Sequence, residues 1–220
     1  MKVTTTTLTT EAIFSEDGKK RYLLHKEWDA NKKQIAIIMF APSEADGIAL
    51  DKTTLQVVNN TVRLGYGGVY ILNLFATLND FTLQTAEKED TENMQMFRMT
   101  LDKADAIIYA PGVGKAKNAV FQERQIQVCK LLKPYEKKLY CLCDMEGKAR
   151  LQHPLSPAVY VWNLAKVTLN EILGESGKKA ERKRENCVTV FGRSKKREDH
   201  RKTLGEVYDP LFLLFFHFLI

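Results

Sequence analysis

The hydrophobic residues of this chain gather in short uninterrupted runs, which amphipathic or polar segments separate. Four runs are typical of strands buried on both faces, at residues 35–40, 69–74, 106–110 and 137–143. Between them, apolar side chains recur with helical spacing at residues 53–64, 91–103 and 115–132. Strands that alternate with helices predict a parallel sheet with right-handed crossovers. We therefore expect a single α/β domain whose short four-stranded parallel sheet is flanked by helices.

Several residues mark where these helices begin and end. Asp51 is well placed to cap the first helix, and the glycine-rich stretch 65–68 ends it, because glycine accepts a left-handed backbone. The apolar positions of this helix are Leu55, Val58, Val62 and Leu64. A last helix is predicted from Pro157, which suits a first helical position, to about Leu173.

The composition divides the chain into three parts. Residues 1–20 are rich in threonine and then in charge, which predicts a flexible or edge-forming lead-in. Residues 21–174 hold the expected α/β domain, and residues 175–220 hold a basic tail and an apolar end. Between Lys178 and Lys202, eleven Lys and Arg side chains accompany four Asp and Glu side chains, in a chain whose net charge is +6. Such a segment can follow nucleic-acid phosphates or simply be a solvated tail.

Nothing in the composition points to a membrane or to secretion. The apolar segment 211–220 is too short to span a bilayer, and the N-terminus lacks the apolar core of a signal peptide. The cysteines have neither zinc-site nor disulfide-framework spacing, so Cys141 and Cys143 are expected to be small buried hydrophobes on one face of a strand. We expect a cytoplasmic protein without a metal or cofactor.

Polar residues stand where three of the expected strands end. The first strand is followed by Ala41, Pro42 and Ser43. The second ends in Asn73, and the fourth leads to His153. Open α/β sheets bind ligands beyond the carboxyl ends of their strands, so these residues form a candidate site. Each also has an ordinary structural explanation, since a buried Asn is usually satisfied locally and a lone His usually serves the fold.

Gly112 and Gly114 precede an expected helix, which could suggest phosphate binding by backbone N–H groups. The complete dinucleotide fingerprint and the Walker pattern are both missing from the sequence. We therefore interpret these glycines as a turn.

Three segments together resemble a known sequence family. They are Ala-Pro-Ser-Glu-Ala-Asp at 41–46, Gly-Tyr-Gly-Gly at 65–68 and Asn-Leu-Phe-Ala at 73–76. They resemble an uncharacterised bacterial and phage family, whose members typically read Asn-Pro-Ser-x-Ala-Asp at the first place. The resemblance spans roughly residues 21–162. Membership of that family names no reaction.

The same skeleton is similar to the uracil-DNA glycosylase superfamily. Those enzymes carry Asp-Pro-Tyr or Asn-Pro after the first strand, an Asn at the end of the second and a His-Pro-Ser-Pro-like loop after the fourth. The matching segments here are Ala-Pro-Ser at 41–43, Asn73, and His-Pro-Leu-Ser-Pro at 153–157. Because their order and strand positions agree, the resemblance implies a uracil-DNA glycosylase-like fold.

The resemblance implies a flipped base in a pocket beneath these loops. Asn73 would hydrogen-bond the edge of the base, and His153 would stabilise negative charge on the leaving base. Tyr66 would be a further stacking candidate. The implied base-binding residues are Asn73, Ser43, Ala41, Pro42 and Phe75. The implied contacts to double-stranded DNA are Leu155 as a wedge into the base stack, Ser156, Lys115 and Lys117.

Ala41 departs from the superfamily, because that position often holds the aspartate that activates water. Asp46 and Glu44 are the nearest carboxylates that could orient water and steady the sugar cation, so these two and His153 are the candidate catalytic residues. Asp51 lies near the same strand end, where solvated loop acids and a helix cap are equally good explanations. The alternative is that hydrolysis is lost and only base binding remains.

Ser43 stands where uracil-specific enzymes have a tyrosine that blocks carbon 5 of the pyrimidine. A smaller residue favours a bulky 5-substituted pyrimidine, such as the glucosylated hydroxymethylcytosine of some phage DNA. The resulting hypothesis is a monofunctional DNA glycosylase that leaves an abasic site and acts in anti-phage defence. Two alternatives stay open: a non-catalytic protein that binds modified DNA, and a small nucleotide-processing enzyme, which only the Gly112–Gly114 turn supports.

Overall fold

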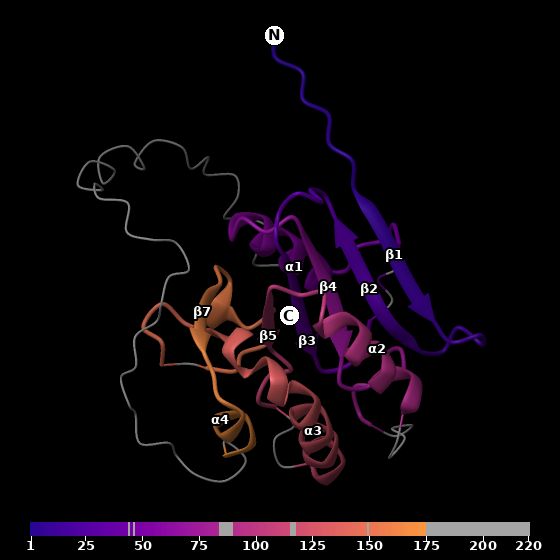
Figure 1. Cartoon of the computed structure of the whole chain (residues 1–220), viewed down its shortest axis with the longest axis vertical. Helices are drawn as coiled ribbons and strands as arrows, with labels where there is room; N and C mark the ends of the chain where they lie inside the picture. Colours follow the sequence, from indigo (N-terminus) through magenta and orange to yellow (C-terminus); the bar gives the residue numbers. More distant parts are fainter. Residues whose placement is uncertain (44, 46, 84–89, 115–117, 149, 175–220) are drawn as a thin grey trace, which may run out of the picture. The chain divides into compact units, whose positions relative to one another are not determined.

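In a computed structural model, shown in Figure 1, seven strands form one mixed sheet. The structure describes residues 1–43, 45, 47–83, 90–114, 118–148 and 150–174. Across the sheet the strands follow the order β1-β2-β4-β3-β5-β6-β7. Their bounds are β1 Thr9–Phe14, β2 Arg21–Glu27, β3 Gln34–Met39, β4 Gly68–Asn73, β5 Ala106–Tyr109, β6 Leu139–Cys143 and β7 Asn163–Lys166.

The four strands expected from the sequence make up the centre of this sheet. β4, β3, β5 and β6 lie side by side, and each pairs in parallel with its neighbour. The side chains of Ile35–Ile38 in β3 are completely buried, because both faces of the sheet are covered there. The expected α/β domain is confirmed. The expected sheet of four parallel strands is too small, because antiparallel strands extend it at both edges.

Part of the expected lead-in belongs to the sheet. Thr9–Phe14 pairs antiparallel with β2, and β2 in turn pairs antiparallel with β4. β1 is an edge strand whose residues are exposed or half-buried. The edge-forming alternative therefore describes this part of residues 1–20.

The prediction of a last helix after the fourth central strand is wrong. Pro157–Val159 forms a single 3-10 turn (η2), Asn163–Lys166 forms β7, and a short helix, α4, covers Leu169–Gly174. β7 pairs antiparallel with β6. Leu164 packs on one face of the sheet and Ala165 on the other, so the apolar residues here follow the two-residue period of a strand.

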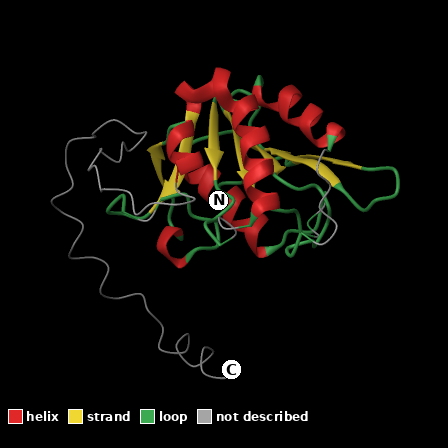
Figure 2. Ribbon diagram, turned by 90° about the horizontal axis from the view of Figure 1, so that it is seen from below, coloured by secondary structure: helices red, strands yellow, loops and turns green. Residues whose placement is uncertain are grey.

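Helices cover both faces of the sheet (Figure 2). α1 (Lys52–Arg63) contributes to the core on one face. α2 (Thr91–Leu101), α3 (Ala119–Leu132) and α4 contribute to the core on the other, and a 3-10 helix, η1 (Lys133–Lys138), follows α3. Among the described residues, no helix is long and apolar enough to cross a membrane.

α1 begins as expected, because the Asp51 side chain caps it. Two of its expected apolar positions, Val58 and Leu64, pack against the core, whereas Leu55 and Val62 are 48% and 50% exposed. The buried residues of α1 are Thr54, Val57, Asn60 and Thr61. Asn60 Oδ1 accepts the Trp162 N–H at 3.1 Å. The buried side therefore includes a polar contact to the loop before β7.

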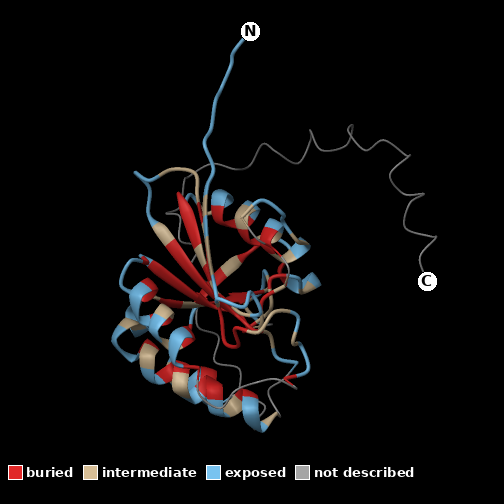
Figure 3. Cartoon of the chain, turned by 90° about the vertical axis from the view of Figure 1, so that its right-hand side faces the viewer, coloured by how far each residue is buried: buried red, intermediate tan, exposed pale blue. Residues whose placement is uncertain are grey.

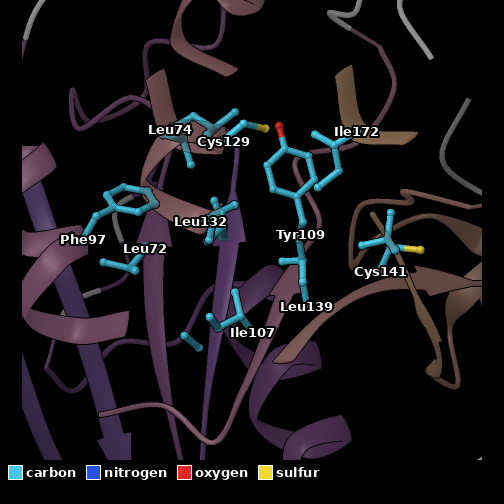
Figure 4. Packing of buried hydrophobic residues seen from close by; sticks show 14 of the residues in the cluster. Leu72, Leu74, Phe97, Ile107, Tyr109, Cys129, Leu132, Leu139, Cys141 and Ile172 are labelled. Carbon is cyan, nitrogen blue, oxygen red and sulfur yellow. The ribbon is translucent and has the colours of Figure 1, made fainter. Parts of the chain in front are cut away.

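Burial is concentrated in the strands, whereas the helices expose their outward-facing side chains (Figure 3). In one core cluster the Tyr109 ring lies among Leu132, Leu139 and other apolar side chains (Figure 4). The buried Tyr109 hydroxyl accepts a hydrogen bond from Gln125 Nε2 at 3.1 Å. Cys141 and Cys143 are buried in this cluster, as the sequence predicted.

Candidate functional site

A pocket of about 550 Å³ lies at the carboxyl ends of β3, β5 and β6. Its walls come from six segments of the chain: the start of β2, the end of β3 with the loop that follows, the first turn of α1, the connection after β4, the loop after β5 and the loop after β6. Parallel strands present their carboxyl ends at one edge of a sheet, and ligands of open α/β folds bind there. The pocket therefore lies where the sequence placed a candidate site.

The structure brings the first and the last sequence motif together. Ala41 and Ser43, from the loop after β3, line the pocket. So do three residues of the loop after β6, which are His153, Leu155 and Ser156. These five predicted site residues therefore share one cavity.

Asn73 and Phe75, in contrast, do not line the pocket. Asn73 is 2% exposed, its carbonyl accepts a hydrogen bond from Asn93 Nδ2 at 3.1 Å, and its own Nδ2 has no partner among the described residues. Phe75 packs edge-on against Phe40, with ring centroids 5.5 Å apart, and lies under the Arg124 guanidinium. Phe75 is thus a core residue, whereas its neighbour Phe40 lines the pocket.

Other predicted residues lie elsewhere. Pro42 is buried, and its carbonyl accepts the Asn79 N–H at 2.9 Å, which holds the loop after β3. Tyr66 precedes β4, at the opposite end of that strand from the pocket, so its suggested stacking role is wrong. The remaining predicted residues lie outside the described residues, and their roles stay predictions: Glu44, Asp46, Lys115 and Lys117.

Asp51, expected as a helix cap, also belongs to the site. Its Oδ1 accepts the Thr54 N–H at 2.6 Å, and its Oδ2 accepts a hydrogen bond from Ser43 Oγ. Burial raises the pKa of Asp51, but these hydrogen bonds and the nearby charge of Arg21 outweigh it, and the pKa lies below its ordinary value. The carboxylate is therefore ionised at neutral pH.

Arg21, which lines the pocket and is 2% exposed, was not predicted. Its guanidinium donates to the Ser43 carbonyl at 3.4 Å and to the Ala45 carbonyl. Burial lowers the pKa of Arg21 to about 10, and the charge of Asp51 opposes this effect. The side chain therefore remains charged at neutral pH and ties the loop after β3 to β2. No local sequence signal marks it, because its partners are more than twenty residues away.

His153 supplies an imidazole to the pocket wall. Its Nδ1 accepts the Leu155 N–H at 3.2 Å. Burial lowers the pKa of His153 below its ordinary value of 6.5, although the charge of Asp51 opposes this. The ring is therefore neutral at pH 7. Since Nδ1 is an acceptor, the single ring proton of the neutral form lies on Nε2.

The loop after β5 fits closely against His153. Gly112 has a φ of +81°, which a residue with a side chain adopts only under strain. A Cβ added at this position would lie 3.1 Å from the Cβ of His153. The glycine is required both for the backbone and for the close approach, which agrees with the interpretation of Gly112 and Gly114 as a turn.

Apolar side chains stand exposed around the pocket. Phe81, Leu155 and Val113 line it, and they are 49%, 47% and 52% exposed. Phe81 was not among the predicted site residues, although an aromatic residue in the long polar connection after β4 is a signal of a functional loop. Such a rim can stack on a flat ring or insert between stacked bases.

The site as a whole combines a neutral imidazole, a serine bound to an ionised carboxylate, and an apolar rim. Within the described ranges, no group of three or more His, Cys, Asp or Glu side chains is placed to hold a metal ion. The arrangement can hold a flat uncharged ring and donate a hydrogen bond from His153 to an atom on which negative charge develops.

Comparison with known families gives one match. The model of a family described as a protein of unknown function (DUF1643) matches residues 21–155, which is more than half of the chain. No curated protein and no solved structure matches. The match agrees with the expected membership of an uncharacterised family, and it does not bear on the resemblance to glycosylases.

Proposed function

The chain belongs to the DUF1643 family of proteins of unknown function, and we propose that it is a DNA glycosylase that excises a bulky 5-substituted pyrimidine and leaves an abasic site. The observation that carries this proposal is the neutral His153 in the wall of a pocket at the carboxyl ends of the central strands. The meeting of the 41–43 and 153–157 segments in that pocket, as their resemblance to uracil-DNA glycosylase motifs implies, supports it, whereas Asn73 does not reach the pocket. The partner is double-stranded DNA, and anti-phage defence is the proposed setting.

The chemistry follows from the protonation of His153. When the bond between the sugar and the base breaks, the electron pair leaves with the base, which becomes an anion. A neutral imidazole with its proton on Nε2 donates a hydrogen bond to that anion without first having to lose a proton. A donor that is already in place where charge develops is worth about 10²–10³ in rate.

The rim of the pocket supports the capture of a base that has left the duplex. A flipped base loses its stacking partners, and aromatic or apolar side chains restore part of that contact. Phe81 lies at the mouth and Phe40 in the wall, while Leu155 is exposed and free to enter the gap in the stack.

The pocket also supports a large base. A volume of about 550 Å³ lies within the range of about 300–1,000 Å³ that small-molecule sites span. Ser43 contributes a small side chain to the wall, at the position where the uracil-DNA glycosylases that the motifs resemble have a tyrosine. Glucosylated hydroxymethylcytosine is therefore the proposed target.

The test uses unmodified, uracil-containing and glucosyl-hydroxymethylcytosine-containing duplexes, which are incubated with the purified chain and then treated with mild alkali. Breaks in the glucosylated duplex alone support the proposal. Breaks in the uracil duplex alone keep the glycosylase but reject the substrate. Tight binding of the glucosylated duplex without breaks in any DNA favours the non-catalytic binder, which Ala41 supports because alanine cannot activate water.

Replacing Ser43 by tyrosine tests the choice of substrate. The larger ring would fill the wall of the pocket, and overpacking costs about 1–3 kcal/mol. Loss of the Ser43 hydroxyl lowers kcat/KM on every base, and we expect the added fall for the glucosylated base, relative to hydroxymethylcytosine without glucose, to be at least about tenfold. Ser15→Tyr is the matched control, because Ser15 bonds to Asp17 outside the pocket. Equal losses on the two bases would show that Ser43 does not select for size.

A further inference from the structure

Ala41 leaves the proposed reaction without its usual water-activating group, and the described part of the site offers another. Ser43 lines the pocket, and its hydroxyl donates to Asp51 Oδ2. Because the hydroxyl proton points to the carboxylate, the lone pairs of Ser43 Oγ remain available to accept a hydrogen bond from water in the pocket. Asp51 stands behind Ser43 and reaches the pocket through it.

The carboxylate is held in one orientation. Its other oxygen, Oδ1, accepts the Thr54 N–H at 2.6 Å, at the start of α1. The loop that carries Ser43 is itself fixed, because the buried Arg21 guanidinium donates to the Ser43 and Ala45 carbonyls. Neither partner of the Ser43–Asp51 hydrogen bond has to move for the pair to receive a water molecule.

The surroundings of Asp51 keep its carboxylate ionised, so that it is able to accept a proton. The hydrogen bonds from Ser43 and Thr54 lower its pKa most, the charge of Arg21 adds to them, and the charge of Asp51 in turn raises the pKa of His153. Asp51 and His153 therefore act on the same region of the pocket, the first as an anion and the second as a neutral donor.

The other serine of the pocket lacks such a partner. The hydroxyl of Ser156 donates to Gln152 Oε1 at 2.8 Å, and an amide oxygen is too weak a base to take a proton at neutral pH. Of the two serines in the described pocket wall, Ser43 is the one whose hydroxyl donates a hydrogen bond to a carboxylate.

We propose that Ser43 binds the attacking water and that Asp51, acting through Ser43, is the positioning residue that accepts its proton. In this step, which rests on the proposed glycosylase function, the bond between the sugar carbon and the base nitrogen breaks, and its electron pair leaves with the base. The water oxygen bonds to the sugar carbon. A water proton passes to Ser43 Oγ as the Ser43 proton passes to Asp51, and His153 Nε2–H stabilises the base anion. A weak base suffices, because a sugar with cationic character reacts readily with water.

The experiment measures single-turnover base release and DNA affinity for Ser43→Ala, Asp51→Asn and Asp51→Glu. Asparagine caps a helix about as well as aspartate, so Asp51→Asn retains the start of α1 while it removes the proton acceptor. We expect both Ser43→Ala and Asp51→Asn to slow base release at least about 100-fold, the lower end of general-base effects. The Kd for glucosylated DNA should change far less, and Asp51→Glu should recover part of the rate.

Asp90→Asn is the matched control. Asp90 caps α2 as Asp51 caps α1, so it tests the same change at a helix start away from the pocket. Its rate should equal that of the wild type. If Ser43→Ala and Asp51→Asn released the base at the wild-type rate, the role of Ser43 and Asp51 in activating water would be rejected, and the proposed glycosylase function would be kept. A wild-type chain that releases no base would overturn the proposed function itself, and the pair with it.

Discussion

Replacing His153 with alanine is expected to lower the rate of base release by about 10²–10³-fold, which is the usual effect of removing one donor to a developing anion. The free energy of unfolding should stay close to that of the wild type, because His153 lies in a loop at the pocket wall rather than in the sheet. The measurement is single-turnover release from glucosylated duplex DNA, combined with unfolding in denaturant.

His25→Ala provides the control for this substitution. His25 is a second partly buried imidazole with a lowered pKa, but it stacks on Tyr70 and does not line the pocket. Its replacement should leave base release unchanged. If His153→Ala released the base as fast as the wild type, the assignment of His153 as the donor to the leaving base would be wrong.

The pH dependence follows from the same residue. Burial lowers the pKa of His153 below 6.5, and the active form is the neutral one. At pH 6.5 most of the His153 side chain is therefore still neutral. Activity should decline only at lower pH, where the imidazole gains a proton. Asp51, whose pKa lies below its ordinary value of 3.8, is still fully ionised at pH 6.5. A profile that already halves at pH 6.5 or above would contradict a buried, neutral His153.

Replacing Gly112 with alanine is the second large expected effect. The backbone at Gly112 has a φ of +81°, and holding a residue with a side chain there costs about 1–3 kcal/mol. The new Cβ would also lie 3.1 Å from the Cβ of His153, so the imidazole has to shift. A misplacement of about 1 Å in an active site can cost about 10²-fold in rate. The contact requires a shift of only a few tenths of an ångström, so we expect a loss of stability and a fall in base release of less than about 100-fold.

Gly114→Ala is the matched control for this prediction. Gly114 also lines the pocket, but its backbone is not left-handed, and an added Cβ would meet no atom within 4 Å. This variant should be as stable as the wild type or slightly more so, and it should release the base at the wild-type rate. Equal losses in the two variants would mean that the loop after β5 acts by its flexibility rather than by its contact with His153.

Much of the fold could be predicted because it is encoded locally. The central strands are continuous apolar runs, and burial on both faces leaves no other place for such residues. The Asp51 cap of α1 and the left-handed Gly112 are properties of single residues in a short stretch of backbone. The position of the candidate site followed as well, because the carboxyl ends of parallel strands meet at one edge.

Helix α1 and strand β7 show where local pattern was misleading. The spacing of the apolar residues around Leu164 is compatible with a helix. In the structure, this segment pairs with β6, and Leu164 and Ala165 lie on opposite faces of the sheet. On α1, the polar Asn60 is buried and bonds to the backbone before β7, whereas the apolar Leu55 is exposed. Both outcomes depend on a partner that lies far away in the sequence.

The sequence by itself determined an α/β domain, its central strands and the loops that form the pocket. Only the tertiary structure decided which side chains reach that pocket: it placed Phe75 in the core and brought Arg21, Ser43 and Asp51 together. The physical reason is the distance along the chain over which each interaction acts. Strand burial and helix caps depend on neighbours in the chain, whereas a buried guanidinium finds its carbonyl partners only after the sheet has brought β2 beside the loop that follows β3.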